Sequence, residues 1–255
     1  MTSTDRSGAV AGYRPGATLG IRVELIRQLK RRRTTATFAF LVLLPLLLIL
    51  AFAVGAEDIE EGNPQVNLVD VATAGSLNFV LFVIFATTGF FLVVVYALFF
   101  GDTIASEASW GSLRYLLAAP VPRGRLLRQK FVVAAILSVS ALVTLTVVSL
   151  VAGAIAYGWN PVRTPVGITL SQGEAVVRLL AILAYLAFTL LTVGSLAFML
   201  SVVTDAPLAA VGGAVFMMII ASILDAIEAL GEIRNYLPTE NQFAWVGTLS
   251  EPMQT

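Results

Sequence analysis

Five long stretches of the sequence contain no charged residue, and they constrain the fold more than any other feature. Crossing the hydrocarbon core of a membrane, which is about 30 Å thick, takes about 20 residues of α-helix. The five stretches are long enough for this, and they cover residues 34–56, 77–100, 131–159, 179–204 and 206–224. The sequence therefore predicts five membrane-spanning segments.

The spans are predicted to be helices because lipid offers no hydrogen-bond partner to a free backbone N–H or C=O group. A strand of a membrane barrel would alternate apolar and polar residues, whereas residues 41–50 read LVLLPLLLIL. Charged residues make up 13% of the chain and apolar residues 58%, against about 25% charged residues in a soluble domain. The predicted fold class is all-α, a polytopic membrane helix bundle.

Residue types that the chain lacks exclude several kinds of active site. The sequence has no cysteine and no histidine, which excludes disulfides, thiol chemistry, His-ligated zinc and Ser-His catalysis. Neither of the two lysines, Lys30 and Lys130, follows a glycine, so there is no Walker A phosphate loop. We expect a protein that is not an enzyme, with no catalytic residue, no metal, no bound cofactor and no nucleic-acid partner.

The distribution of charge predicts which side of the membrane each loop occupies. Basic residues precede the first span and fill the loop between the second and third spans, whereas residues 57–70 contain acidic residues and no Lys or Arg. Loops rich in Lys and Arg remain in the cytoplasm. The N-terminus and the second loop are therefore predicted to be cytoplasmic, and the tail after the fifth span is predicted to be external.

Residues 18–33 are predicted to form an amphipathic helix at the membrane surface, between a disordered cytoplasmic tail at 1–17 and a transmembrane domain at 34–255. Its apolar residues fall in two neighbouring rows at helical spacing: Ile21, Leu25 and Leu29, then Leu19, Val23 and Ile26. Glu24 and Arg27 fall on the other side, which fits a helix that lies at an interface. The alternative is that the basic run only fixes the topology.

The loop between the second and third spans, residues 102–130, is long for a membrane connection and is patterned. Its apolar residues recur at helical spacing, at Ile104, Trp110, Leu113, Leu116 and Leu117. Pro120 and Pro122 are predicted to end this short helix, and a basic segment from Arg123 to Lys130 leads into the third span. Either this helix docks onto a partner, or the loop lies at the lipid surface and its arginines only set the topology.

The same loop carries a motif that resembles a known family. In order, it contains Glu107, Gly111-Ser112-Leu113-Arg114, Leu116-Leu117, Pro120-Val121, Arg123, Leu126-Leu127 and Lys130. This motif resembles that of the membrane subunits of ATP-binding-cassette exporters of the second type. Those subunits typically carry a glutamate, Gly-Thr-Leu, a leucine pair, a proline, an arginine and a lysine at this spacing, just before the third span. Ser112 replaces the usual threonine.

The resemblance implies a permease subunit of an ATP-driven exporter in the bacterial cytoplasmic membrane. Such a subunit forms a dimeric pathway with a second permease copy or a paralogue, and a separate ATPase subunit binds the ATP and Mg. The loop would supply a coupling helix that contacts the ATPase, with Glu107 and Arg114 pairing across the seam. The residues assigned to this coupling contact are Glu107, Trp110, Gly111, Leu113, Arg114, Leu117, Pro120 and Arg123. The family normally has six spans, so the resemblance also implies a sixth span that is missing from this chain.

Three acidic residues follow the fifth span at helical spacing. Asp225, Glu228 and Glu232 stand at i, i+3 and i+7, which would place them on one face of a helix. That face could hold a cation or attract a cationic substrate. The simpler interpretation is an exposed external helix after Leu224.

Two other classes of function fit the composition less well. A non-transporting membrane assembly or sensor protein is the main alternative, and failure to recover an ATPase partner would favour it. An intramembrane aspartyl protease needs two facing Asp residues, and Asp225 is the single candidate near a span.

Overall fold

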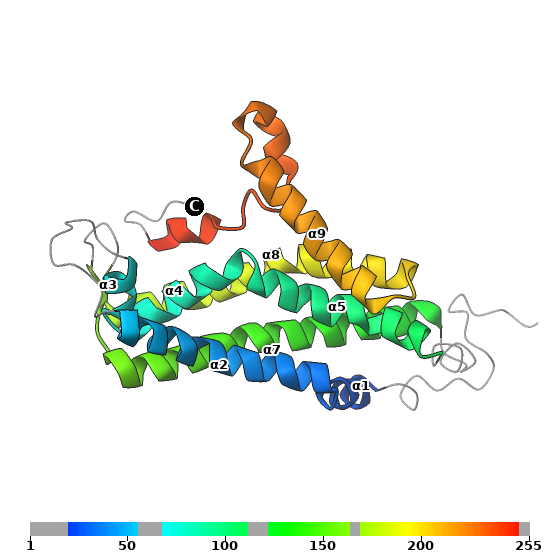
Figure 1. The fold of residues 1–255 in the computed structure, drawn as a ribbon, viewed down its shortest axis with the longest axis horizontal. Helices are drawn as coiled ribbons and strands as arrows, with labels where there is room; N and C mark the ends of the chain where they lie inside the picture. Colours follow the sequence, from blue (N-terminus) through cyan, green and yellow to red (C-terminus); the bar gives the residue numbers. More distant parts are fainter. Residues whose placement is uncertain (1–19, 56–67, 112–121, 164–168, 250–255) are drawn as a thin grey trace, which may run out of the picture.

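The computed structural model describes residues 20–55, 68–111, 122–163 and 169–249. Within these residues, five helices are long and apolar enough to cross a membrane: α2 (Arg32–Gly55), α5 (Phe91–Ser109), α7 (Arg123–Tyr157), α8 (Gln172–Val203) and α9 (Pro207–Asp225). Figure 1 shows α2, α5, α7 and α8 side by side along the longest axis of the molecule. The prediction of an all-α polytopic bundle is confirmed. The predicted tail at 1–17 lies outside the described residues.

Short elements complete the fold, namely α1 (Ile21–Leu29), α3 (Leu68–Thr73), α4 (Ser76–Thr88), β1 (Val162–Arg163), β2 (Thr169–Leu170), η2 (Glu228–Tyr236) and η3 (Ala244–Leu249). The two strands pair antiparallel, with Val162 opposite Leu170. The Asn78 side chain holds this hairpin on α4: its amide donates to the Arg163 carbonyl at 2.6 Å and its oxygen accepts from the Arg163 N–H at 3.0 Å. Because Asn78 satisfies both backbone groups, the hairpin is fixed at one end of the bundle.

The second span differs from the single helix predicted over residues 77–100. Helix α4 ends at Thr88, the chain bends at Gly89 and Phe90, and α5 then begins. Phe90 has φ −137° and ψ −55°, outside the helical region. The side-chain amide of Gln242 donates to the Thr88 carbonyl at 2.7 Å. It thereby satisfies one of the carbonyls that a helix end leaves free.

The predicted loop at 102–130 is shorter than expected at both ends. Helix α5 continues through Asp102 to Ser109, and α7 begins at Arg123, eight residues before the predicted start at Phe131. The helices continue past these charged residues because Asp102 and Lys130 are buried and paired inside the protein. Residues 112–121 lie outside the described part of the chain.

Small residues allow α5 to approach its neighbours closely. A Cβ atom added to Gly194 of α8 would lie 2.7 Å from the Phe100 ring of α5, and one added to Gly101 of α5 would lie 2.9 Å from a methyl group of Val211 of α9. Glycine at such contacts permits helices to pack backbone to side chain. Helix α5 is therefore in tight contact with both α8 and α9.

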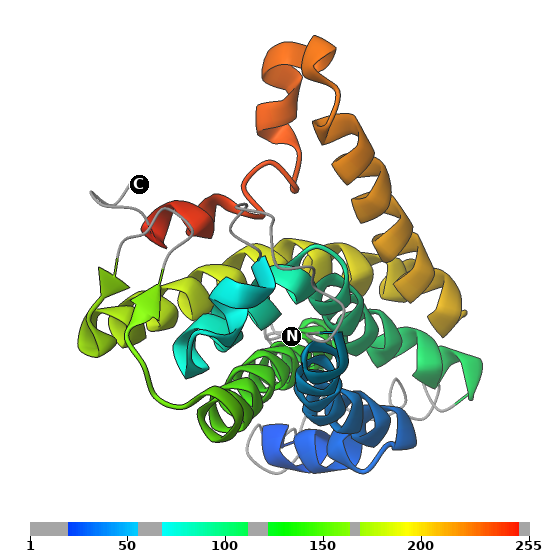
Figure 2. The same cartoon turned by 60° about the vertical axis from the view of Figure 1, so that its left-hand side comes forward.

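Helix α9 leaves the bundle after its first turns. In both views it diverges from the other long helices, and η2 lies at its far end (Figures 1 and 2). Pro207 occupies its first turn, where a missing N–H leaves no hydrogen bond unmade. Between residues 226 and 249 the chain forms η2 and η3 and no further long helix. The sixth span stays a prediction.

Candidate functional site

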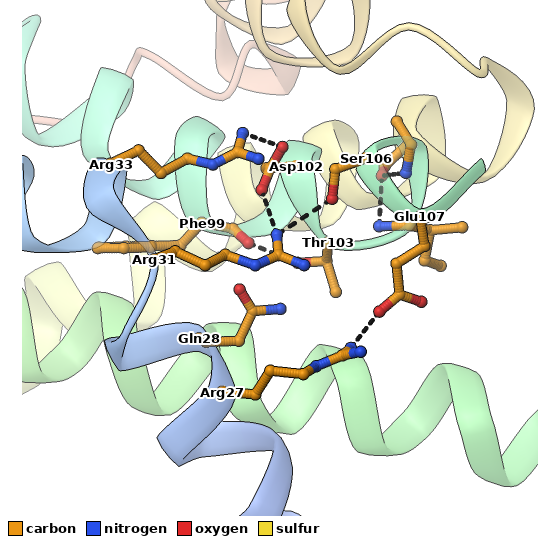
Figure 3. Close-up of polar contacts among 12 residues, drawn as sticks. Arg27, Gln28, Arg31, Arg33, Phe99, Asp102, Thr103, Ser106 and Glu107 are labelled. Atoms are coloured by element: carbon orange, nitrogen blue, oxygen red, sulfur yellow. Dashed lines mark hydrogen bonds and ion pairs between the residues drawn. The ribbon is translucent and has the colours of Figure 1, made fainter. Parts of the chain in front are cut away.

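Charged residues gather at the end of the bundle where α1, the start of α2, the end of α5 and the start of α7 meet (Figure 3). We call this the inner end, because its excess of Lys and Arg predicts that it faces the cytoplasm. Figures 1 and 2 show α1 lying across the direction of the long helices. A short turn at Lys30 and Arg31 then leads into α2. The predicted helix at 18–33 is thus divided in two.

The centre of the site is an ion pair between α5 and α7. Glu107 and Lys130 are each 2% exposed, and the Lys130 ammonium donates to Glu107 Oε1 at 2.7 Å. Lys130 also donates to Glu24 of α1, at 3.1 Å. Removing one partner of a buried ion pair costs about 3–5 kcal/mol, because the other charge is left uncompensated. This pair therefore holds the two helices that flank the loop in one relative position.

Helix α1 contributes both an acid and a base to the same network. Arg27 donates to Glu24 at 2.8 Å and also to Glu107, so that it bridges α1 and α5. The Gln28 side chain donates to Glu24 at 3.1 Å. Burial pushes the pKa of Glu24 upward, but Lys130 and Arg27 outweigh this effect and hold the pKa below its usual value. Glu24 is therefore charged in the folded protein at neutral pH.

A second cluster joins the start of α2 to α5. Asp102 is buried and accepts hydrogen bonds from Arg31, at 2.8 Å, and from Arg33. Arg31 also donates to the hydroxyl of Ser106 at 3.1 Å. Asp102 and Ser106 are four residues apart and so lie on one face of α5. Arg31 and Arg33 belong to the basic segment before the first span, which was interpreted as a topology signal. They also make specific contacts within the chain.

Helix α8 contacts the same part of α5 through a hydroxyl group. The Ser201 oxygen accepts from the backbone N–H groups of Ile104 and Ala105, at 3.1 Å and 2.9 Å. Ser201 is 1% exposed, so water does not compete for these bonds. The last turns of α5 are therefore joined by ion pairs to α1, α2 and α7, and by hydrogen bonds to α8.

The predicted coupling residues divide into different environments. Glu107 is buried and pairs with Arg27 and Lys130 of the same chain. Trp110 is 75% exposed at the end of α5, and Gly111 follows it with φ +69°. Arg123, the first residue of α7, is exposed. Leu113, Arg114, Leu117 and Pro120 lie outside the described residues, and so does the predicted pairing of Glu107 with Arg114.

Sequence reasoning missed most of the ionic network. The residues that it did not assign to the site are Glu24, Arg27, Gln28, Arg31, Arg33, Asp102, Ser106 and Lys130. One usable signal was present. Asp102 and Glu107 are the two acids between an apolar span and a basic segment, so each had basic residues available as partners.

The predicted acidic face after the fifth span is wrong. Helix α9 ends at Asp225, Ile227 has extended backbone angles, and Gly231 interrupts η2 with φ +52°. The three acids therefore do not share one helical face. Asp225 lies 3.5 Å from the Arg234 guanidinium, which also lies 3.8 Å from Glu240. Among the described residues, no group of three or more acidic side chains is arranged to hold a metal ion.

Comparison with known proteins assigns the chain to a family. The model of the family described as "ABC-2 family transporter protein" matches residues 21–240, which include the whole ionic network and all five long helices. Neither the curated proteins nor the solved structures gave a match. The chain therefore belongs to the ABC-2 transporter family and is a multi-pass membrane permease component of an ABC transporter.

Proposed function

We propose that this permease forms the dimeric transmembrane pathway of an ATP-driven exporter in a bacterial cytoplasmic membrane. A second copy or a paralogue completes the pathway, and a separate ATPase subunit binds ATP and Mg and drives it. The observation that carries the proposal is the buried pair between Glu107 and Lys130, which joins the two helices on either side of the loop. A push on the loop would therefore move both helices together.

The contacts of α5 would carry that movement into the membrane. Arg27, Arg31 and Arg33 attach α1 and the start of α2 to α5, so these elements move with it. In the other direction, α5 packs closely on α8 and α9. Breaking the buried pairs is costly, so the inner end transmits a displacement as one body instead of absorbing it.

The exposed end of α5 is suited to contact the ATPase. The side chain of Trp110 is large and 75% exposed. Tryptophans that become buried when two proteins bind often contribute most of the binding free energy. Gly111 turns the chain in the left-handed region that glycine adopts without steric penalty. Exposed Arg123 adds a positive charge that could pair with an acid on the partner.

Co-purification with an ATPase subunit tests this proposal. Trp110→Ala should weaken the complex and lower its ATP turnover, because the exposed anchor is removed. Trp159→Ala is the matched control, since Trp159 is also exposed but lies beside the hairpin at the opposite end of the bundle. The proposal fails if Trp110→Ala leaves the complex unchanged. If the wild-type chain recovers no ATPase under gentle solubilisation, a non-transporting assembly or sensor role is favoured instead.

An apolar pocket supports a hydrophobic or amphipathic cargo. It has a volume of about 420 Å³ and lies between the bend at Gly89–Phe90 and the outer half of α9. Val93 and Met218 line it, and the hydroxyl of Ser222, which also lines it, donates to the Met218 carbonyl of the same helix at 3.0 Å. Mostly apolar pockets with a few polar groups are typical of small-molecule sites. Met218→Trp should fill the pocket and reduce ATP-driven uptake of a lipophilic dye into inverted vesicles, while ATPase binding is retained.

A further inference from the structure

Helix α1 turns its apolar side away from the protein. Ile21, Val23, Ile26 and Leu29 are between 43% and 69% exposed, whereas Glu24 is buried against α7 through Lys130. Leu25 alone among the five apolar residues of α1 packs against the core, so the usual arrangement for a surface helix, with apolar residues inward, is largely reversed. A reversed helix that lies across the bundle axis (Figure 2) presents its apolar side to whatever surrounds the end of the bundle.

The charge on this outer side is positive only. Arg22, Lys30 and Arg32 are exposed, and among the described residues none of them has an acidic partner. The acid of α1, Glu24, lies inside and is already paired. Arg123 and Arg128 add two further exposed cations on the first turns of α7, which packs against α1.

The acids of the inner end do not offset these cations. Glu24, Asp102 and Glu107 are all buried and paired with bases inside the protein. Within the described part of this end, Asp205 is the one acid with an exposed side chain. The exposed surface around α1 therefore has a positive potential that the buried pairs leave intact.

We propose that α1 and the start of α7 bind anionic phospholipid headgroups of the adjacent leaflet. Apolar residues at the surface of a membrane helix enter the acyl region, while flanking Lys and Arg contact the headgroups. Each such cation near an anionic membrane surface contributes about fivefold to binding. Bound lipid holds α1 across the end of the bundle, where Glu24 and Arg27 meet Lys130 and Glu107.

Lipid fits this surface better than a protein partner does. Exposed aliphatic residues and cations occur together on the outer surface of a helix that lies across the direction of the long helices and leads directly into the first span, α2. A membrane surface meets such a helix along its whole length. Binding of free phosphate would use the cations and leave the apolar residues in water.

The test uses the purified full-length chain in a neutral detergent, with phosphatidylglycerol or phosphatidylcholine added to the micelles. The thermal unfolding midpoint and the number of lipids retained in native mass spectrometry are measured. Phosphatidylglycerol should stabilise the chain and be retained in preference to phosphatidylcholine. The triple variant Arg22→Gln, Lys30→Gln, Arg32→Gln should weaken the apparent affinity for phosphatidylglycerol about a hundredfold.

Control variants separate charge from other effects. Arg22→Lys with Arg32→Lys keeps the charge and should keep the preference for phosphatidylglycerol. Lys30→Gln alone provides a milder variant and should give a smaller loss. Inorganic phosphate should not reproduce the stabilisation by lipid.

Two outcomes would overturn the proposal. The first is a triple variant that keeps the full preference for phosphatidylglycerol; if that variant also no longer co-purifies with an ATPase subunit, α1 is a protein interface instead. The second is equal stabilisation by inorganic phosphate, which would identify a simple anion site.

Discussion

Neutralising both members of the buried pair between Glu107 and Lys130 should cost less free energy of unfolding than the sum of the two single neutralisations. The variants are Glu107→Gln, Lys130→Gln and the combination of the two. Gln keeps a polar side chain of similar shape, so the change mainly removes charge. Both side chains are 2% exposed, so neither charge that remains after a single substitution can turn toward water.

The contacts predict the order of the effects. At 2.7 Å the gross attraction between the two charges is about 6 kcal/mol for an effective dielectric constant of about 20, and desolvation offsets much of it. Glu107→Gln leaves Lys130 with Glu24 at 3.1 Å, so its cost should be near the low end of the range for broken buried pairs, about 3 kcal/mol. Lys130→Gln removes the ammonium that pairs with both buried acids, Glu24 and Glu107, so its cost should be about 5 kcal/mol.

The double variant carries the decisive comparison. Independent sites would give the sum of the single effects, whereas two members of one pair show a coupling of about 0.5–3 kcal/mol. Unfolding in mixed micelles, titrated with sodium dodecyl sulfate, measures all three free energies. Arg128→Gln is the control, because Arg128 is exposed on the same helix. Additive effects, or a Glu107→Gln cost no larger than that of the control, would refute the ionic network as described.

Three further predictions concern other contacts. A Cβ atom on Gly194 would lie 2.7 Å from Phe100, so Gly194→Val should lower the unfolding free energy by about 1–3 kcal/mol, whereas Gly212→Val, with open space around it, should not. Ser201→Ala removes the hydroxyl that accepts from two amides of α5 and should cost about 1–3 kcal/mol in the same titration. The lowered pKa of Glu24 stabilises the folded state above the usual pKa of 4.5, and this stabilisation is lost as the pH falls through the lower folded value. Glu24→Gln should therefore flatten the loss of thermal stability below about pH 4.5.

Apolar length was sufficient to predict the number of span-length helices and the approximate position of four of them, because the bilayer imposes its thickness on every crossing helix, but the second proved to be α4, a bend and α5. It was not sufficient to predict where the helices end. Asp102 looked like the end of a span, but its partners Arg31 and Arg33 lie about 70 positions earlier in the chain and allow the charge to be buried. The bend at Phe90 could not be predicted from the local sequence either, because the Gln242 amide that caps α4 lies 154 residues further along the chain.

The sequence also could not predict which side of α1 faces the protein. Periodicity placed Glu24 and the aliphatic residues on opposite sides of α1, and the structure shows this for four of the five aliphatic residues, whereas Leu25 packs against the core on the side of Glu24. Periodicity alone does not say which side meets the protein. In water the apolar side of a helix would face the protein. Beside a membrane the polar side can face the protein instead, when the protein supplies an opposite charge for it, as Lys130 does for Glu24.

The basic residues of the inner end do more than a topology signal requires. Retaining a loop in the cytoplasm needs only positive charge near the end of a span, and exposed residues such as Arg22 and Arg123 provide it. Burying Lys130 opposite Glu107 adds a desolvation penalty of several kcal/mol per ion, and well-packed apolar residues of similar volume are often at least as stabilising. What the buried charges provide is a single relative position of α1, α5 and α7. We infer that fixing this position, rather than stabilising the fold, is their role, in keeping with the proposal that the permease passes a displacement from its loop to its spans.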